Sequence, residues 1–128
     1  MYPIGARQNL FHGTIAAGGT LSSEIEISDY SALTLMSDAN LALGTLSFQV
    51  APYSDNDIPA DLAGLGVDTT PLYRDLLGSN GAALAIGPVS GAIAIQSSVI
   101  SQYLGGHRFV KIKMTPAQAS GVHFFLTG

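Results

Sequence analysis

The sequence predicts an all-β fold, an antiparallel β-sandwich of jelly-roll type with about eight short strands. Within residues 32–50, Leu46, Phe48 and Val50 alternate with polar residues, which is the pattern of strands buried on one face only. The 15 glycines lie mostly between such segments and favour turns. No stretch has the period of a long amphipathic helix. A small closed barrel is the alternative architecture.

The first two expected strands are joined by a glycine-rich turn. Residues 10–15 form the first strand and residues 16–19 the turn. In the second strand, residues 20–27, Glu24 and Glu26 lie on one face, as is typical of a solvated edge strand. The opposite, apolar face of this strand carries Leu21, Ile25 and Ile27.

The two strands within residues 32–50 are separated by a segment rich in turn-forming residues. Asp38, Asn40 and Gly44 favour a turn or a bulged loop there. The polar faces of the two strands contact either water or a partner in an assembly, and the alternation itself does not decide between them. These polar residues are Thr34, Ser47 and Gln49.

A long acidic loop follows at residues 52–71, within a single domain that spans residues 14–128. The loop contains three prolines and four aspartates but no basic residue. Loops longer than about 12–15 residues are uncommon in compact domains and are often functional. We therefore expect this loop to be a contact element. Residues 1–13 form an N-terminal arm.

The second half of the chain predicts further short strands. The expected order is an extended segment at 70–77, a turn at 78–81, two strands within 82–95 separated at 87–91, one helical turn within 97–104, and strands at 108–114 and 122–127. The strand at 108–114 is the clearest, since Lys111 and Lys113 alternate with three apolar residues. These are Val110, Ile112 and Met114.

Composition excludes several classes of partner. The net charge of −4 has the wrong sign for a nucleic-acid partner, and the absence of cysteine excludes disulfides and thiolate metal sites. Charged residues are only 11% of the chain, which suits a protein packed against copies of itself or a larger assembly. No segment has the length of a signal peptide or a membrane span, so we expect cytoplasmic synthesis and no membrane partner.

Two groups of residues have side chains of the types that bind metal ions. Asp55, Asp57 and Asp61 are oxygen donors suited to calcium, but their spacing departs from an EF-hand loop. The histidines, His12, His107 and His123, are expected on three separate strands or strand ends, without the short spacing of paired metal ligands. The sequence therefore predicts no cofactor, and the three aspartates are a weak candidate for a cation site.

Motifs of catalysis are absent from the sequence. The serine-hydrolase motif GxSxG and the phosphate-binding motifs GxxxxGK[ST] and GxGxxG do not occur. Glu24 and Glu26 lie two residues apart on one strand, not opposed as a glycosidase requires. We therefore expect a protein that is not an enzyme. Tyrosines on a sandwich face can stack on sugars, and five are scattered here: Tyr2, Tyr30, Tyr53, Tyr73 and Tyr103.

Three strand patterns resemble those of small virion proteins of tailed bacteriophages. They are T-I-x-x-G-x-x-L-S-x-x-I-x-I at 14–27, L-S-F-Q-V at 46–50 and F-V-K-I-K at 109–113, followed by a final apolar strand. The chain is similar in this respect to capsid decoration, or cement, proteins, which are β-sandwich or jelly-roll subunits that often form trimers. The acidic loop at 52–71 departs from the simple turn of that pattern.

The resemblance implies a non-enzymatic structural protein on the outer surface of a phage head. Its expected partners are the major capsid protein and two further copies of itself in a homotrimer. The residues we expect at these contacts lie in the arm and the acidic loop: Tyr2, Pro3, Ile4, Arg7, Leu10, Phe11, Asp55, Asp57, Asp61 and Asp68. The alternative function is a carbohydrate-binding β-sandwich module, assisted by calcium and carried by a virion or a secreted assembly.

Overall fold

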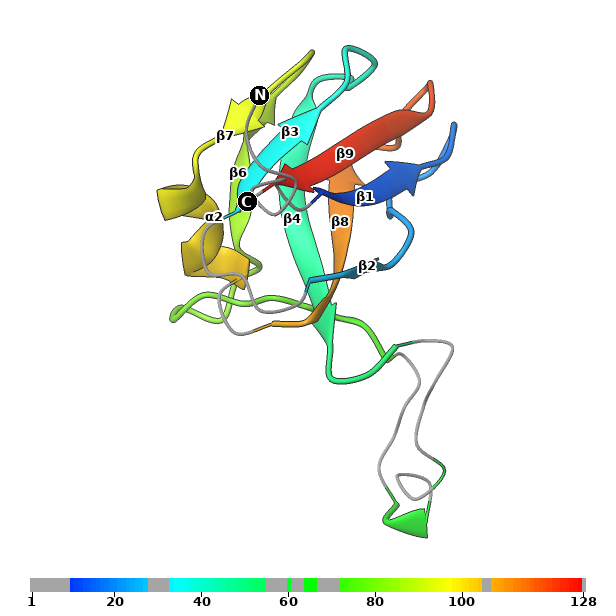
Figure 1. The fold of residues 1–128 in the computed structure, drawn as a ribbon, viewed down its shortest axis with the longest axis vertical. Coiled ribbons are helices and arrows are strands. Elements are labelled where there is room, and N and C mark those ends of the chain that lie inside the picture. The colour runs from blue at the N-terminus through cyan, green and yellow to red at the C-terminus, as the bar shows by residue number, and fades with distance from the viewer. Residues whose placement is uncertain are drawn as a thin grey trace, which may run out of the picture.

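The computed structural model describes residues 10–27, 33–54, 60, 64–66, 72–104 and 107–127. The described residues form nine strands and the helix α2 (Figure 1). In chain order these elements are β1 (Leu10–Ile15), β2 (Ile25–Glu26), β3 (Thr34–Ser37), β4 (Gly44–Ala51), β5 (Arg74–Asp75), β6 (Ala85–Val89), β7 (Ala94–Ile95), α2 (Ser97–Leu104), β8 (Phe109–Thr115) and β9 (Val122–Thr127).

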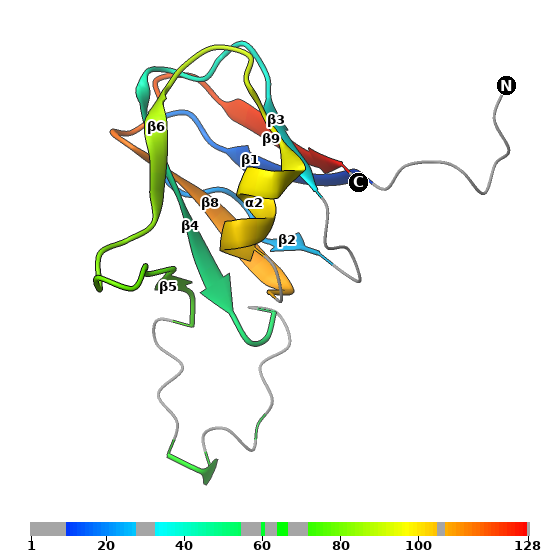
Figure 2. The same cartoon turned by 90° about the vertical axis from the view of Figure 1, so that its left-hand side faces the viewer.

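The strands form two antiparallel sheets that pack face to face, and the predicted sandwich is thereby confirmed. We name them sheet A, with strand order β1-β9-β3-β7, and sheet B, with order β2-β8-β4-β5 and with β6 also paired to β4. The first four strands alternate between the two sheets, as do β8 and β9, and this winding is that of a jelly roll. Figures 1 and 2 show the two sheets crossing one another at an angle.

Alternating apolar residues of both sheets fill the space between them. In β8, Val110, Ile112 and Met114 are fully buried, as the sequence predicts, and they lie opposite Val50, Phe48 and Leu46 of β4. Sheet A contributes five fully buried side chains to the same core, namely Ile15, Leu35, Val122, Phe124 and Leu126. Each such side chain contributes about 1.5–3 kcal/mol through its removal from water.

The two strands predicted within residues 32–50 are β3 and β4, which belong to different sheets. Their alternation is confirmed, since Leu33 and Leu35 of one segment and Leu46 and Phe48 of the other are buried. The connection between them turns at residues 38–40 and carries the chain across the end of the sandwich. The pair is therefore a corner between sheets.

The single strand expected at residues 20–27 is wrong in its first half. The chain crosses from sheet A to sheet B here, and only Ile25–Glu26 forms a strand, at the edge of sheet B. Ser22 can be buried because its polar groups are hydrogen-bonded. Its backbone N–H donates to the carbonyl of Ile112 at 2.8 Å, and the N–H of Ile112 donates to Ser22 Oγ, also at 2.8 Å. Leu21, expected on the apolar face, is 36% exposed instead.

Two further boundaries differ from the sequence prediction. The break expected at residues 87–91 lies after Val89, because β6 continues through Gly87 and Pro88. The register of β6 against β4 shifts between Gly44 and Leu46, and this irregularity accommodates the extra residues. The helix α2 is longer than one turn, with eight residues, and buries Ile100 and Leu104.

The helix α2 closes one side of the sandwich. In Figure 1 it lies on the side opposite β1 and β2, next to β7, and it contacts β3 of sheet A. None of the described helices is long and apolar enough to cross a membrane. The side of the sandwich with β1 and β2 has no such helical cover in the described part of the chain.

A buried glutamine joins three connections at one end of the sandwich. Gln118, in the connection between β8 and β9, is fully buried, and its Oε1 accepts a hydrogen bond from the N–H of Ala42 at 2.7 Å. The backbone carbonyl of Gln118 accepts a hydrogen bond from the N–H of Gly18 at 2.6 Å, and the backbone N–H of Gln118 donates to the carbonyl of Gly19 at 2.9 Å. These bonds link the β1–β2, β3–β4 and β8–β9 connections.

At Gly44 the backbone of β4 lies so close to the backbone of β8 that a side chain would clash. A Cβ atom there would lie 2.7 Å from the carbonyl oxygen of Thr115, so we expect Gly44→Ala to lower the free energy of unfolding by about 1–3 kcal/mol. Gly121→Ala is the matched control, because its Cβ would lie 3.7 Å from the nearest atom, Ile15 O. Urea unfolding of both variants measures the difference, and equal stabilities would contradict the expectation.

Candidate functional site

Most of the residues predicted to contact partners lie outside the described residues. This applies to Tyr2, Pro3, Ile4 and Arg7 of the arm and to Asp55, Asp57, Asp61 and Asp68 of the acidic loop, including the weak calcium candidates. The remaining two, Leu10 and Phe11, begin β1 and are paired with Thr127 and Leu126 of β9. Phe11 packs against the core, so the arm joins the sheet from residue 10 onward.

A pocket of about 430 Å³ lies at the end of sheet B from which the acidic loop leaves. Its walls combine rings with charged and hydroxyl groups, and its lining residues are Glu26, Pro52, Tyr53, Ser54, Arg108 and Phe109. The Tyr53 side chain is 38% exposed, which leaves its ring accessible to a bound molecule. A concave site of this size with a few polar groups has the dimensions of a small-ligand site.

An ion pair forms the charged wall of this pocket. Arg108 donates from Nε at 3.0 Å and from Nη2 at 2.7 Å to the same oxygen of Glu26, Oε1. Both side chains are more than half exposed, so the pair contributes at most about 1 kcal/mol to stability. The ion pair also fixes the position of the guanidinium group, which lies over the Phe109 ring with its central carbon 5.3 Å from the ring centroid.

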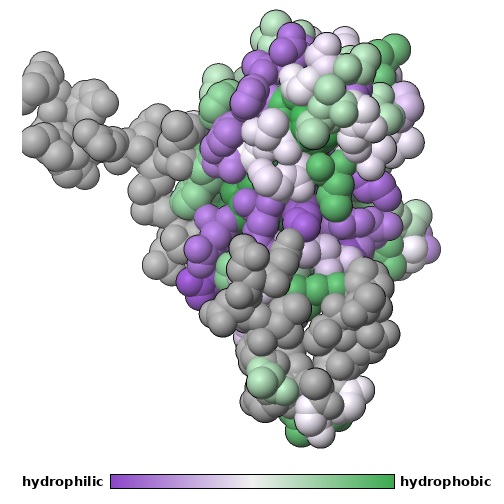
Figure 3. Space-filling view, turned by 90° about the vertical axis from the view of Figure 1, so that its right-hand side faces the viewer, coloured by the Kyte–Doolittle hydropathy of each residue, from purple (hydrophilic) through white to green (hydrophobic). Residues whose placement is uncertain are grey.

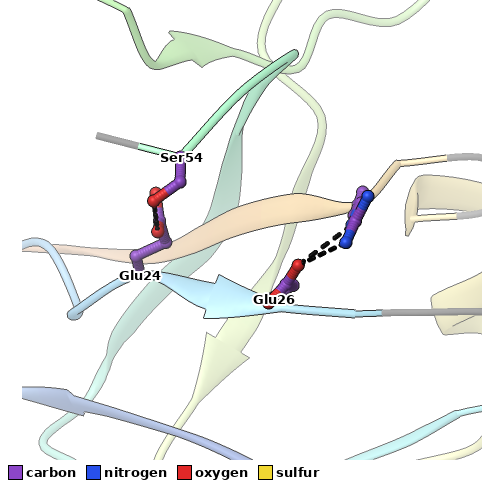
Figure 4. Close-up of polar contacts among 4 residues, drawn as sticks. Glu24, Glu26 and Ser54 are labelled. Atoms are coloured by element: carbon purple, nitrogen blue, oxygen red, sulfur yellow. Dashed lines mark hydrogen bonds and ion pairs between the residues drawn. The ribbon is translucent and has the colours of Figure 1, made fainter. Parts of the chain in front are cut away.

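Glu24 ties together the two ends of the acidic loop. Its carboxylate accepts hydrogen bonds from Ser54 Oγ at 2.6 Å and from the buried Tyr73 hydroxyl at 2.5 Å. Ser54 lies near the start of the loop and Tyr73 follows its end, and Figure 4 shows Glu24 facing Ser54 beside β2. The prediction that both glutamates are simply solvated is therefore wrong for Glu24, which is half-buried and acts as a clamp.

The outer face of sheet B carries nearly all the charge of the described residues. Lys113 lies 3.8 Å from Asp75, and Lys111 Nζ lies 4.4 Å from the centroid of the Tyr73 ring. Gln49 also donates to Asp75, at 3.0 Å. All four described cations, Arg74, Arg108, Lys111 and Lys113, lie on sheet B or next to it. Sheet A therefore carries no described lysine or arginine, and Asp38, which follows β3, is the charged residue beside it.

Two of the three histidines meet on the outer face of sheet A. His12 of β1 and His123 of β9 approach to 2.9 Å between Nε2 and Nδ1, and Thr14 Oγ1 lies 3.2 and 3.1 Å from these two nitrogens. The Phe125 ring lies 5.3 Å from the His12 ring, centroid to centroid. His107, between α2 and β8, lies apart from them. Sequence spacing gave no signal of this cluster, because its two histidines are 111 residues apart.

The molecular surface has scattered hydrophobic residues. Leu43, Leu65 and Leu77 are each more than half exposed, and Met36 of β3 is 41% exposed. On the side where β1 and β2 lie, hydrophobic and hydrophilic residues are interspersed (Figure 3). Such a surface leaves many small apolar contacts for an assembly and repels other copies weakly.

The fold defines an all-β sandwich with jelly-roll winding. Comparison with models of known protein families, with curated proteins and with solved structures found no match to this chain.

Loss of the Tyr73 hydroxyl should destabilise the clamp. We expect Tyr73→Phe to lower the free energy of unfolding by about 1.5–3 kcal/mol, because a half-buried carboxylate loses a charged hydrogen bond. Arg108→Ala is the control and should cost at most about 1 kcal/mol, because its ion pair is exposed. Chemical unfolding measures both, and a larger cost for Arg108→Ala would refute the assignment of the clamp.

Proposed function

We propose that this protein is a non-enzymatic structural protein of a phage head, a decoration protein bound on the outside of the capsid to the major capsid protein. Jelly rolls are common among viral capsid proteins and lectins, so the fold is compatible with this function and with the alternative below. The observation that carries the proposal is an open strand edge on β1, beside the arm.

The backbone hydrogen bonds of Thr14 establish which way β1 presents its open edge. The Thr14 N–H donates to Ser23 Oγ at 3.1 Å and its carbonyl accepts from the Ser23 N–H at 3.0 Å, both away from β9. Residues two apart on a strand direct their backbone groups the same way. The N–H and carbonyl of His12 therefore also face away from β9, and they have no hydrogen bond to any described residue.

An unpaired edge of this kind accepts a strand from another chain. The occupant we propose is the part of the arm that precedes β1 in the sequence, residues 2–9, supplied by a neighbouring copy. Head-to-tail exchange of arms closes into a ring when the rotation between copies permits it, and a homotrimer is such a ring.

The acidic loop is the proposed contact with the major capsid protein. The clamp at Glu24 fixes both of its ends to sheet B, so the loop starts from a defined place on the sandwich. Four aspartates without a basic residue favour a basic patch on the capsid. Three loops in one trimer bind together, which raises the effective concentration of each contact.

The open edge can be tested with His12→Pro. Proline removes an N–H that β9 does not use, so the fold should remain while arm exchange is blocked. We expect light scattering to give three times the 13.2 kDa chain mass for the wild type and for His12→Ala, but the mass of one chain for His12→Pro. Loss of trivalency should also weaken binding to undecorated capsids of the same phage by about 10²-fold or more.

His12→Ala is the control because it removes the side chain and keeps the backbone N–H. Circular dichroism should be unchanged in both variants. A monomeric wild type, or a trimer that survives His12→Pro, would refute arm exchange on β1. A wild-type protein with no affinity for capsids would refute the decoration function itself.

The pocket favours a second candidate function, binding of a carbohydrate. An accessible Tyr53 ring can stack on a sugar, while Glu26, Arg108 and Ser54 can hydrogen-bond to its hydroxyl groups. The pocket volume of about 430 Å³ is sufficient for one or two sugar rings. In this candidate function the aspartates of the acidic loop, which lie outside the described residues, would bind calcium.

A glycan array separates this candidate from capsid decoration. If the pocket binds sugars, Tyr53→Ala should abolish glycan binding because the ring is lost, whereas Tyr53→Phe should retain most of it. Chelation of calcium tests the metal requirement in the same array. Capsid binding that is insensitive to sugars and chelators, together with an empty array, would exclude the carbohydrate function.

A further inference from the structure

The cluster of His12, Thr14 and His123 on sheet A lies apart from the pocket and from the acidic loop. In the pairing of β1 with β9, Thr14 lies opposite His123 and His12 lies opposite Phe125, so the two histidines are diagonal neighbours on the same face. Both are exposed. The cluster therefore presents two imidazoles and one hydroxyl to the solvent at adjacent positions.

The two imidazoles share one hydrogen bond. Their planes are inclined by 16° and their centroids are 5.1 Å apart, which exceeds the roughly 3.5–4.0 Å of direct contact between ring faces. The close contact is between His12 Nε2 and His123 Nδ1, at 2.9 Å. One nitrogen donates its N–H and the other accepts with a lone pair, so at least one imidazole is neutral and available as a ligand.

The three donor atoms are spaced like neighbouring ligands of one metal ion. Their mutual distances are 2.9, 3.1 and 3.2 Å. For metal–nitrogen distances of about 2.0–2.1 Å, adjacent ligands are separated by roughly 2.8–3.4 Å in octahedral and tetrahedral sites. A modest rotation of the exposed rings turns both lone pairs toward a shared ion, with little change in the separation of the strands.

The charges around the cluster favour a cation. No described lysine or arginine lies on sheet A, since all four lie on sheet B or next to it. The nearest charged side chain with a contact to the cluster is Asp38, whose Oδ2 accepts from the backbone N–H of His123 at 3.2 Å. A carboxylate beside the cluster attracts a cation bound there.

We propose that His12 and His123 bind a divalent late transition metal, of which zinc is the probe, with Thr14 as a third and weaker oxygen ligand. Imidazole selects zinc, copper and nickel over calcium and magnesium. Among the described residues no three His, Asp or Glu side chains form a metal cluster, so water completes the coordination and the site is open. The ion would join β1 to β9 across the face of the sheet.

The three histidines of the chain provide the test and its control. Untagged protein titrated with Zn²⁺ in a calorimeter at pH 7.5 should bind one ion per chain. His12→Ala and His123→Ala should each abolish that saturable binding, whereas His107→Ala, whose imidazole lies apart from the cluster, should retain it. Zn²⁺ should also raise the unfolding temperature of the wild type and of His107→Ala only.

Protons compete with the metal for the same lone pairs, so binding should be lost at pH 5. Absence of saturable binding to folded wild-type protein would overturn the proposal. Binding that survives in His12→Ala or His123→Ala, or that His107→Ala abolishes, would overturn it as well. Because His12→Ala keeps the backbone edge, loss of zinc with retention of the trimer separates this site from arm exchange.

Discussion

The pairing of β4 with β8 is the interaction on which the rest of the structure depends. Seven residue pairs in uninterrupted antiparallel register, from Thr45 with Thr115 to Ala51 with Phe109, form the centre of sheet B. This register places the buried side chains of both strands on one face, against sheet A. A slip of one residue would expose all of them, so the apolar core and the register enforce each other.

The same register determines the outer face of sheet B and hence the candidate site. Because Ile112 faces the core, Lys111 and Lys113 must face outward, beside Gln49 and Ser47 of β4. Tyr73 can then lie beneath Lys111 and reach Glu24 on the edge strand. The pocket at Tyr53 and the clamp of the acidic loop thus follow from an alternation that the core requires.

The sequence was sufficient to predict strands with one buried face but not their partners. β4, β8 and β9 agree with prediction because alternation reports burial directly. The assignment of β3 and β4 to different sheets leaves no local signal, since a corner and a hairpin use the same turn residues. At Ser22 a hydroxyl takes a buried position because it bonds to Ile112, which lies 90 residues away.

The candidate site was predicted only in part for the same reason. In the sequence Tyr53 is one of five scattered tyrosines, and nothing local distinguishes it, because its pocket depends on Arg108 and Phe109 at the distant start of β8. The clamp joins Glu24 to Ser54, which lies 30 positions away in the sequence, and to Tyr73, which lies 49 positions away. The two histidines of the cluster are separated by 111 positions. Contacts between such distant residues come from topology, which composition and local spacing do not encode.

The buried Gln118 also has a consequence for the order of folding. Its hydrogen bonds require residues 18–19, 42 and 118 to be in place together, so they form only after both sheets have assembled. Bringing segments this far apart in sequence together costs conformational entropy before their contacts can stabilise the chain. We therefore expect these contacts to form after the folding barrier, so that loss of Gln118 accelerates unfolding more than it slows folding.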